Sequence, residues 1–158
     1  MGRVTALVVC VGAVVLPVGT RAIGQDNKEK DARVTLEIRL AEKELANGLT
    51  EMAAPRTKDK IYVHTKAAVG NADIAQARVV KNALGQPAVE VVFAKGSREK
   101  VSDFSGRNIG KVAAIFIDGK LVDAPVIRAK FSDKTEIWGA VPFTPQEAER
   151  IAKGLKHE

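Results

Sequence analysis

Few residues in this chain have side chains that could do chemistry, and they lie far apart. The two histidines, His64 and His157, have no cysteine, histidine or carboxylate at a spacing typical of metal ligands. Asp118 and Asp123 come closest to a carboxylate pair for general acid–base work. The turn that Asp118 makes with Gly119 already explains the first carboxylate, and Asp123 lies on the next strand, where its side chain is expected to point away. The sequence therefore predicts no catalytic and no metal-binding residue.

The serines and glycines also lack the patterns of an enzyme. No serine stands in a G-x-S-x-G context. The glycines occur singly at turns, so neither a phosphate-binding loop nor a cofactor is expected. These patterns favour a non-enzymatic binding or structural module. A small hydrolase is the opposing hypothesis, and it would need a cluster of titratable groups.

The composition is that of one domain behind a leader. The 158 residues are 46% hydrophobic, which is enough for a core, although only 4% are aromatic. The formal charge is +6, but basic residues are interspersed with acidic ones. Because a nucleic-acid surface combines a concentrated basic face with stacking aromatic residues, nucleic acid is not an expected partner.

Residues 1–24 have the layout of a secretory signal peptide. Arg3 precedes an uncharged apolar run from Val4 to Val18, and small residues follow at cleavage spacing. The run is shorter than the ~20 residues that span a bilayer. An uncleaved anchor is therefore the weaker alternative, and a lipoprotein anchored through Cys10, the only cysteine, is weaker still. We expect export to the periplasm or cell envelope of a bacterium, with no membrane span in the mature chain.

The rest of the chain divides into a short linker and one domain. Residues 25–32 are charged and have no apolar period, which predicts a disordered linker. Residues 33–158 form the expected domain, organised around the stretch 108–131. There Asp118-Gly119 predicts a type I′ hairpin turn between two strands, and Pro125 places part of the second strand at an edge or a bulge.

The flanking segments predict an α+β fold with a mainly antiparallel sheet covered by helices on one face. Thr144 and Glu147 form a capping box at the start of the most clearly patterned helix, whose apolar residues recur at helical spacing. Asn71 and Ser97 are expected to cap two further helices. The predicted elements are strands at 33–40, 61–64, 77–82, 88–94, 112–117 and 135–141, and helices at 71–77, 97–108 and 144–155.

Several motifs in this order resemble the periplasmic P1 head subdomain of the protein-export membrane protein SecD. The similarity covers about Lys60 to Leu155. The motifs that carry it are Asn71-Ala72-Asp73-Ile74, Gly85-Gln86-Pro87-Ala88-Val89, the stretch 108–128 with Asn-Ile-Gly-Lys, Ile-Asp-Gly-Lys and Ala-Pro-Val-Ile, Ile137-Trp138-Gly139, and Phe143-Thr144-Pro145-Gln146-Glu147-Ala148.

The resemblance implies a ferredoxin-like head that engages a translocating polypeptide and is not itself an enzyme. It singles out motif residues expected to be structural, and it identifies no binding residue. Those motif residues are Gly110, Asp118, Gly119, Pro125 and Gly139.

The chain also departs from the family pattern. It has no transmembrane bundle, the segment Lys130–Lys134 lacks the usual Gly-Gly, and Ser105-Gly106 replaces a more helix-friendly pair. These departures indicate a free-standing, head-like protein. Its expected partners are unfolded or translocating polypeptide, bound at a strand edge near Pro125 or Trp138 by β-augmentation, or components of the Sec translocon. The alternative is an envelope scaffold or binding module unrelated to export.

Overall fold

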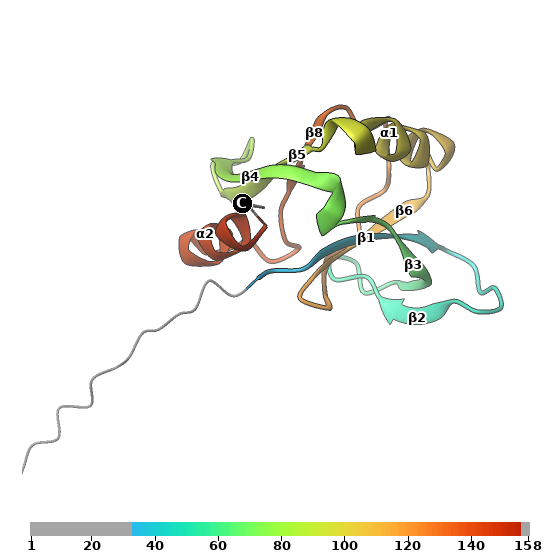
Figure 1. Ribbon diagram of the computed structural model, residues 1–158. Coiled ribbons are helices and arrows are strands. Elements are labelled where there is room, and N and C mark those ends of the chain that lie inside the picture. Colours follow the sequence, from blue (N-terminus) through green and yellow to red (C-terminus); the bar gives the residue numbers. More distant parts are fainter. Residues whose placement is uncertain (1–32, 156–158) are drawn as a thin grey trace, which may run out of the picture.

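The structure, a computed structural model, describes residues 33–155 (Figure 1). The predicted leader, the predicted linker and His157 lie outside the described residues. Eight strands form two antiparallel sheets, and two α-helices and two short 3-10 helices accompany them. The elements are β1 (Leu36–Glu42), β2 (Thr50–Ala53), β3 (Lys60–Gly70), η1 (Asn71–Asp73), β4 (Ile74–Lys81), β5 (Pro87–Phe93), η2 (Lys95–Ser97), α1 (Arg98–Arg107), β6 (Val112–Ile117), β7 (Lys120–Asp123), β8 (Lys134–Ile137) and α2 (Pro145–Gly154).

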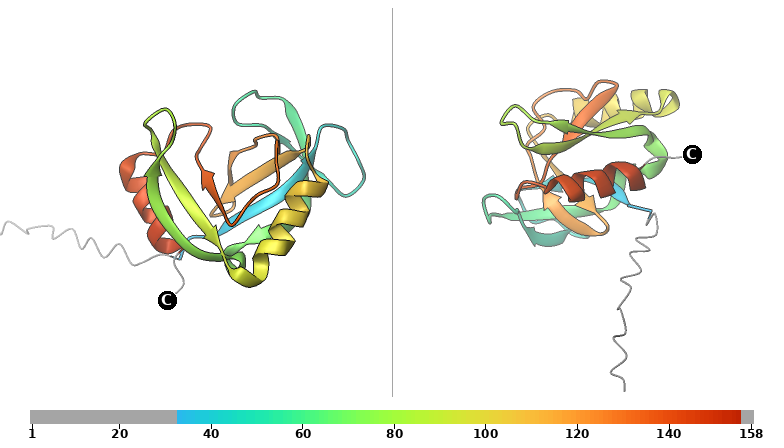
Figure 2. Two further views of the ribbon diagram at one scale, coloured as in Figure 1. Left: turned by 90° about the horizontal axis from the view of Figure 1, so that it is seen from above. Right: turned by 90° about the vertical axis from the view of Figure 1, so that its left-hand side faces the viewer.

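The predicted α+β class with antiparallel strands is confirmed, but the strands divide between two sheets instead of forming one. A five-stranded sheet has the order β2-β3-β1-β6-β7, and a three-stranded sheet has the order β4-β5-β8. The two sheets are splayed in the left view of Figure 2, with α1 and α2 at their sides. Period-two alternation reports which face of a strand is buried. It does not report which strand lies alongside, and for this reason the division was not predicted.

The central strand β1 serves two apolar clusters on opposite faces of its sheet. Val34, Leu36 and Ile38 belong to the main core between the sheets, whereas Ala41 belongs to a smaller cluster around Phe116 on the other face. Ala41 lies an odd number of residues from the other three, so the ordinary period-two alternation of a strand places it on the opposite face. The irregular pairing between β1 and β3 arises from extra residues in β3. Pairing with β6 stays continuous, so β1 and β6 form the rigid centre of the fold.

The predicted turn between β6 and β7 is confirmed. Asp118 and Gly119 have φ angles of 50° and 76°, as a type I′ turn requires at its two central positions. The second strand is shorter than predicted and ends at Asp123. After it, the carbonyl of Pro125 accepts a hydrogen bond of 2.9 Å from the N–H of Ala113. Since β7 is an edge strand, the edge position expected near Pro125 is also confirmed.

The C-terminal helix α2 forms as predicted. The Thr144 hydroxyl accepts from the Glu147 N–H at 3.2 Å, and the Glu147 carboxylate accepts from the Thr144 N–H at 2.8 Å. Ala148 and Ile151 are buried, and the helix packs on β4 and β5. At its end, the Gly154 carbonyl accepts from the Val34 N–H at 3.2 Å. The two ends of the described chain therefore meet beside α2.

Three local predictions are wrong. The helix expected from Asn71 to Ala77 is a single 3-10 turn followed by β4, because the Asn71 side chain bonds across to the Leu36 N–H and the Val34 carbonyl instead of capping a helix. Ser97 occupies the N-cap position of α1 but makes no side-chain cap. The last strand ends at Ile137 and not at residue 141.

The pair Ser105-Gly106 has a clear packing role in α1. The buried Ser105 hydroxyl accepts from the Phe131 N–H at 2.7 Å. The side chain of Lys130 lies so close over Gly106 that a Cβ there would overlap it. The segment 130–131 thus packs against the small residues of α1, and it forms one wall of the site described below.

Asp73 fastens the junction between the two sheets. Its carboxylate accepts from the Gly70 N–H at 3.0 Å and from the Lys100 ammonium at 2.8 and 2.9 Å, and its carbonyl accepts from the Ala94 N–H. Burial raises the pKa of Asp73, but the hydrogen bonds from Lys100, Gly70 and Ser97 outweigh burial and hold the pKa below its ordinary value. A carboxyl with a lowered pKa stabilises the fold while it is ionised.

The stability of the fold is expected to fall in acid partly through Asp73. On acidification, the Asp73 carboxyl is protonated in the unfolded chain before it is protonated in the folded chain. Its contribution to the free energy of unfolding is therefore complete above the ordinary pKa of about 4 and is lost as the pH falls through the lower pKa of the folded state. Asp73→Asn is expected to be less stable at neutral pH and to lose less stability on acidification. Urea unfolding at neutral and acidic pH measures both quantities. Asp103→Asn, at an exposed helix position, is the control, and an unchanged acid response in Asp73→Asn would contradict the prediction.

Candidate functional site

The two carboxylates considered as an acid–base pair are held in separate interactions. Asp118 accepts from the Thr35 N–H at 2.9 Å and from Arg150 at 2.8 Å. Burial raises the pKa of Asp118, but these hydrogen bonds outweigh it and lower the pKa. Asp123 is fully buried and takes two hydrogen bonds, of 2.9 and 2.8 Å, from Arg56. Both carboxylates therefore act as anchors for neighbouring segments.

Arg56 is the residue of this region that sequence reasoning missed. Besides Asp123, it reaches the carbonyl of Gly139 at 3.3 Å, so it joins the β2–β3 loop to two segments far along the chain. The separation of 67 residues between Arg56 and Asp123 leaves no local pattern that could have identified the pair. A bidentate arginine–carboxylate pair fixes geometry as well as charge.

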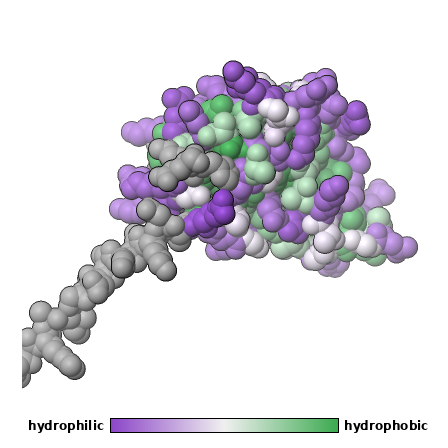
Figure 3. Space-filling view, in the orientation of Figure 1, coloured by the Kyte–Doolittle hydropathy of each residue, from purple (hydrophilic) through white to green (hydrophobic). Residues whose placement is uncertain are grey.

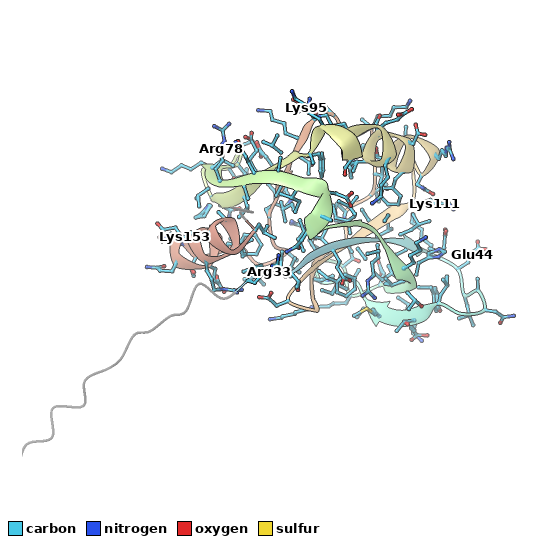
Figure 4. All side chains as sticks on the ribbon, in the orientation of Figure 1. Arg33, Glu44, Arg78, Lys95, Lys111 and Lys153 are labelled. Carbon is cyan, nitrogen blue, oxygen red and sulfur yellow. The ribbon has the colours of Figure 1, made fainter. Side chains whose placement is uncertain are left out.

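His64 lies on β3 and is half-buried. Its Nε2 is 3.5 Å from the Glu42 carboxylate, which also accepts from Lys111 at 2.8 Å. Among residues 33–155 there is no group of three potential metal ligands. This cluster is an ion-pair network at the end of the fold opposite α2, close to the labelled Glu44 and Lys111 in Figure 4.

A groove of about 320 Å³ opens between β8 and the segment Pro125–Ser132. We call it the β8 groove. Its floor belongs to the main core and consists of Ile38, Ala113 and Ile115 from β1 and β6. Its size lies at the lower end of the range of ligand-binding pockets. The apolar floor favours an occupant that brings apolar side chains.

A second hollow of about 470 Å³ adjoins the β8 groove and shares four lining residues with it. We call it the side hollow. Arg56 and the turn 82–86 form its other walls. The shared residues are Pro125, Val126, Arg128 and Trp138.

Exposed apolar side chains gather around these hollows. Leu84 is 81% exposed and Val126 is 42% exposed, and both line the side hollow, while the 81% exposed Val141 precedes the lining residue Pro142. The Asn82 carboxamide oxygen accepts from the N–H groups of Leu84 and Gln86 at 2.9 and 3.0 Å, so the turn that presents Leu84 is well ordered. Exposed apolar surface beside a hollow is typical of an interaction site.

The edge of β8 completes the site. Among the described strands, β8 pairs with β5 alone, so its other edge borders the β8 groove without a partner strand. At the start of β8, the Ser132 hydroxyl donates a hydrogen bond of 3.2 Å to the Lys134 carbonyl. An unpaired strand edge can accept an extended peptide by backbone hydrogen bonding.

Of the family-motif residues, Pro125 lines both hollows and Gly139 lines the side hollow. Gly110 has a φ of 89°, and its N–H donates to the Ile127 carbonyl at 2.8 Å. Gly139 follows Trp138 in a close passage against Val141 and Phe143. Asp118 and Gly119 form the turn between β6 and β7 and line neither hollow.

The surface charge is distributed over many elements. On the face seen in Figure 3, hydrophilic residues surround smaller apolar areas. The labelled cations Arg78, Lys95, Lys111 and Lys153 lie on different elements at the periphery in Figure 4. Within the described residues, no helix is long and apolar enough to cross a membrane.

Comparison with known proteins gives a consistent result. Residues 43–157 match the family model of the SecDF P1 head subdomain. The protein translocase subunit SecD of Aquifex aeolicus is 37% identical over 130 residues, which cover 80% of this chain and 26% of that protein. The protein translocase subunit SecDF of Thermus thermophilus is 42% identical over 57 residues, which cover 36% of this chain and 8% of that protein.

Solved structures agree with these matches. The chain is similar to a structure of the membrane component SecDF that enhances protein export, with a TM-score of 0.60 and 25% identity over 80% of this chain and 63% of that one. It is also similar to SecDF in a super-membrane-facing form, with a TM-score of 0.62 and 26% identity over 80% of this chain and 19% of that one. The chain thus spans about a quarter of the Aquifex relative. The resemblance drawn from its motifs is confirmed, and the chain belongs to the SecDF P1 head subdomain family.

Proposed function

We propose that this chain is a non-enzymatic, exported module that binds extended polypeptide during protein export. The single observation that carries the proposal is the β8 groove, where an unpaired strand edge borders an apolar floor. Main-chain hydrogen bonds from a strand edge give affinity for any extended peptide, and the floor accommodates alternate side chains. Similarity to SecDF, a membrane component that enhances protein export, supports a task in export.

The proposal includes the predicted location and partners. The leader at residues 1–24 would direct the chain to the periplasm or cell envelope and be removed, and residues 25–32 would form a linker ahead of the domain. There it would meet translocating polypeptide or components of the Sec translocon. For the motif residues we propose a structural role, supported by the positive φ angles of Gly110, Asp118 and Gly119 and by the close backbone passage at Gly139.

Binding is expected to be visible in the fluorescence of Trp138, because this sole tryptophan lines both hollows. Titration of the purified protein with a short extended peptide is expected to change that fluorescence with saturation. Val126→Asn is expected to weaken binding about fivefold, the effect of losing about 1 kcal/mol of apolar contact.

Val79→Asn is the matched control, because Val79 is 41% exposed and lines neither hollow. Equal effects of the two substitutions would place the peptide elsewhere. A complete lack of peptide binding, with in-cell cross-linking that recovers only envelope proteins unrelated to export, would favour the scaffold alternative.

A further inference from the structure

We propose that the β8 groove selects extended segments in which apolar and acidic residues alternate. This inference rests on the proposed function, since it specifies which polypeptides the groove binds. It follows from the way in which the two walls of the groove sort their side chains into an inner apolar row and an outer charged row.

The β8 wall sorts its side chains by the period of a strand. Ile137 is 1% exposed and Thr135 is half-buried, and both point toward the core. Lys134 and Glu136 alternate with them and are exposed. A peptide strand added to this edge continues the same pleat. Its side chains therefore alternate between the apolar floor and the row of Lys134 and Glu136.

The opposite wall repeats this division. Ile127 is 2% exposed and belongs to the main core, whereas the three residues after it, Arg128, Ala129 and Lys130, are exposed and two of them are cations. Neither cation makes an ion pair with another residue of the described chain. The outer side chains of a bound peptide would thus lie between Arg128 and Lys130 on one side and the outer row of β8 on the other.

The charges of the outer rows leave an excess of positive charge. Lys134 pairs with Glu90 at 3.0 Å, but Glu90 is also paired with Arg78, so this group keeps a net positive charge. Glu136 is the single carboxylate of the β8 groove lining that is outside these pairs. Arg128 and Lys130 belong to the same lining and make no ion pair among the described residues, and the side chain of Lys130 also packs over Gly106 of α1. Electrostatic complementarity then favours acidic side chains in the outer row of the peptide and disfavours basic ones.

The selection is tested with three short peptides that share alternating valines. The intervening positions are all glutamate, all glutamine or all lysine, and each peptide is used at a concentration where it is monomeric. Trp138 fluorescence at low salt is expected to give the affinity order glutamate, glutamine, lysine. We expect about a tenfold difference between the first and the last, the size of two or more partly screened charge contacts. The difference is expected to shrink at high salt.

A double substitution, Arg128→Glu with Lys130→Glu, is expected to reverse the order. The matched control is Lys95→Glu with Lys153→Glu, which changes the net charge equally at exposed positions outside both hollows and is expected to keep the order. The milder Lys130→Gln, expected to reduce the difference without reversing it, serves if the double variant fails to fold, as circular dichroism reports.

The outcomes separate this inference from the proposed function. Equal affinities for the glutamate and lysine peptides, with clear binding of all three, would overturn the charge selection and leave the proposed function in place. A reversal of the order by the Lys95 and Lys153 control would show that net charge acts at a distance, which also overturns the selection. Failure of every peptide to bind would overturn the proposed function itself.

Discussion

Arg56→Leu is expected to lower the free energy of unfolding by about 2–3 kcal/mol, the cost of leaving a buried carboxylate without its charged partner. Asp123 has a fully buried side chain, and Arg56 supplies two of its hydrogen bonds. The N–H of Ala124 supplies another at 2.9 Å. That bond cannot compensate for the missing charge. The Arg56 side chain is about half exposed. In the variant, water can therefore take over part of its hydrogen bonding to Asp123, and the loss in the free energy of unfolding stays below that of a fully buried ion pair.

Urea unfolding of three variants measures this effect. Arg56→Leu combined with Asp123→Asn is expected to recover much of the loss, because the neutral amide needs no counter-charge and can still accept from Ala124. Arg78→Leu is the matched control, because its partner Glu90 retains Lys134. A loss for Arg56→Leu no larger than that for Arg78→Leu would show that solvent reaches Asp123 freely.

Gly139→Ala is expected to destabilise the fold by about 1–3 kcal/mol, as overpacking does in a closely packed segment. A Cβ at this position would overlap the carbonyl oxygen of Val141 and crowd the ring of Phe143. Since the obstacle includes backbone, the segment itself must move. The Gly139 carbonyl accepts from Arg56 and the residue follows Trp138, so peptide binding is expected to weaken together with stability.

Gly96→Ala provides the comparison for this substitution. A Cβ at Gly96 meets no atom within 4 Å, and Gly96 lies in a short 3-10 helix where alanine is tolerated. It is expected to leave stability unchanged or slightly raised, through the reduced entropy of the unfolded chain. Thermal unfolding and the Trp138 titration compare the two variants. Equal behaviour of Gly139→Ala and Gly96→Ala would mean that the segment 139–143 relaxes without cost.

Sequence reasoning succeeded where local chemistry decides the structure. The Asp118-Gly119 turn and the Thr144 capping box form as expected, because φ angles and end-capping groups are set by neighbouring residues. It failed at Asn71, whose side chain bonds to the segment before β1. A contact that spans more than thirty residues competes with a helix cap and leaves no trace in the local pattern.

The site was predicted only in outline. The edge position near Pro125 and the location of Trp138 followed from proline chemistry and from the family motifs. The apolar floor under them comes from β1 and β6, and it becomes a groove only because β8 belongs to a separate sheet. Pairing of distant strands and the bond from Arg56 to Asp123 depend on tertiary packing, which a periodic pattern does not encode.

The meeting of Val34 with Gly154 beside α2 determines how mechanical load would enter this domain. Tension applied at both ends of the described region would act on one corner of the domain. It would first load the hydrogen bond from the Val34 N–H to the Gly154 carbonyl and then the neighbouring bonds between Thr35 and Asp118. These hydrogen bonds would break one after another instead of all at once. Neither Val34 nor Gly154 lines the β8 groove, so a load applied at this corner would not act directly on the contacts of a polypeptide held in the groove.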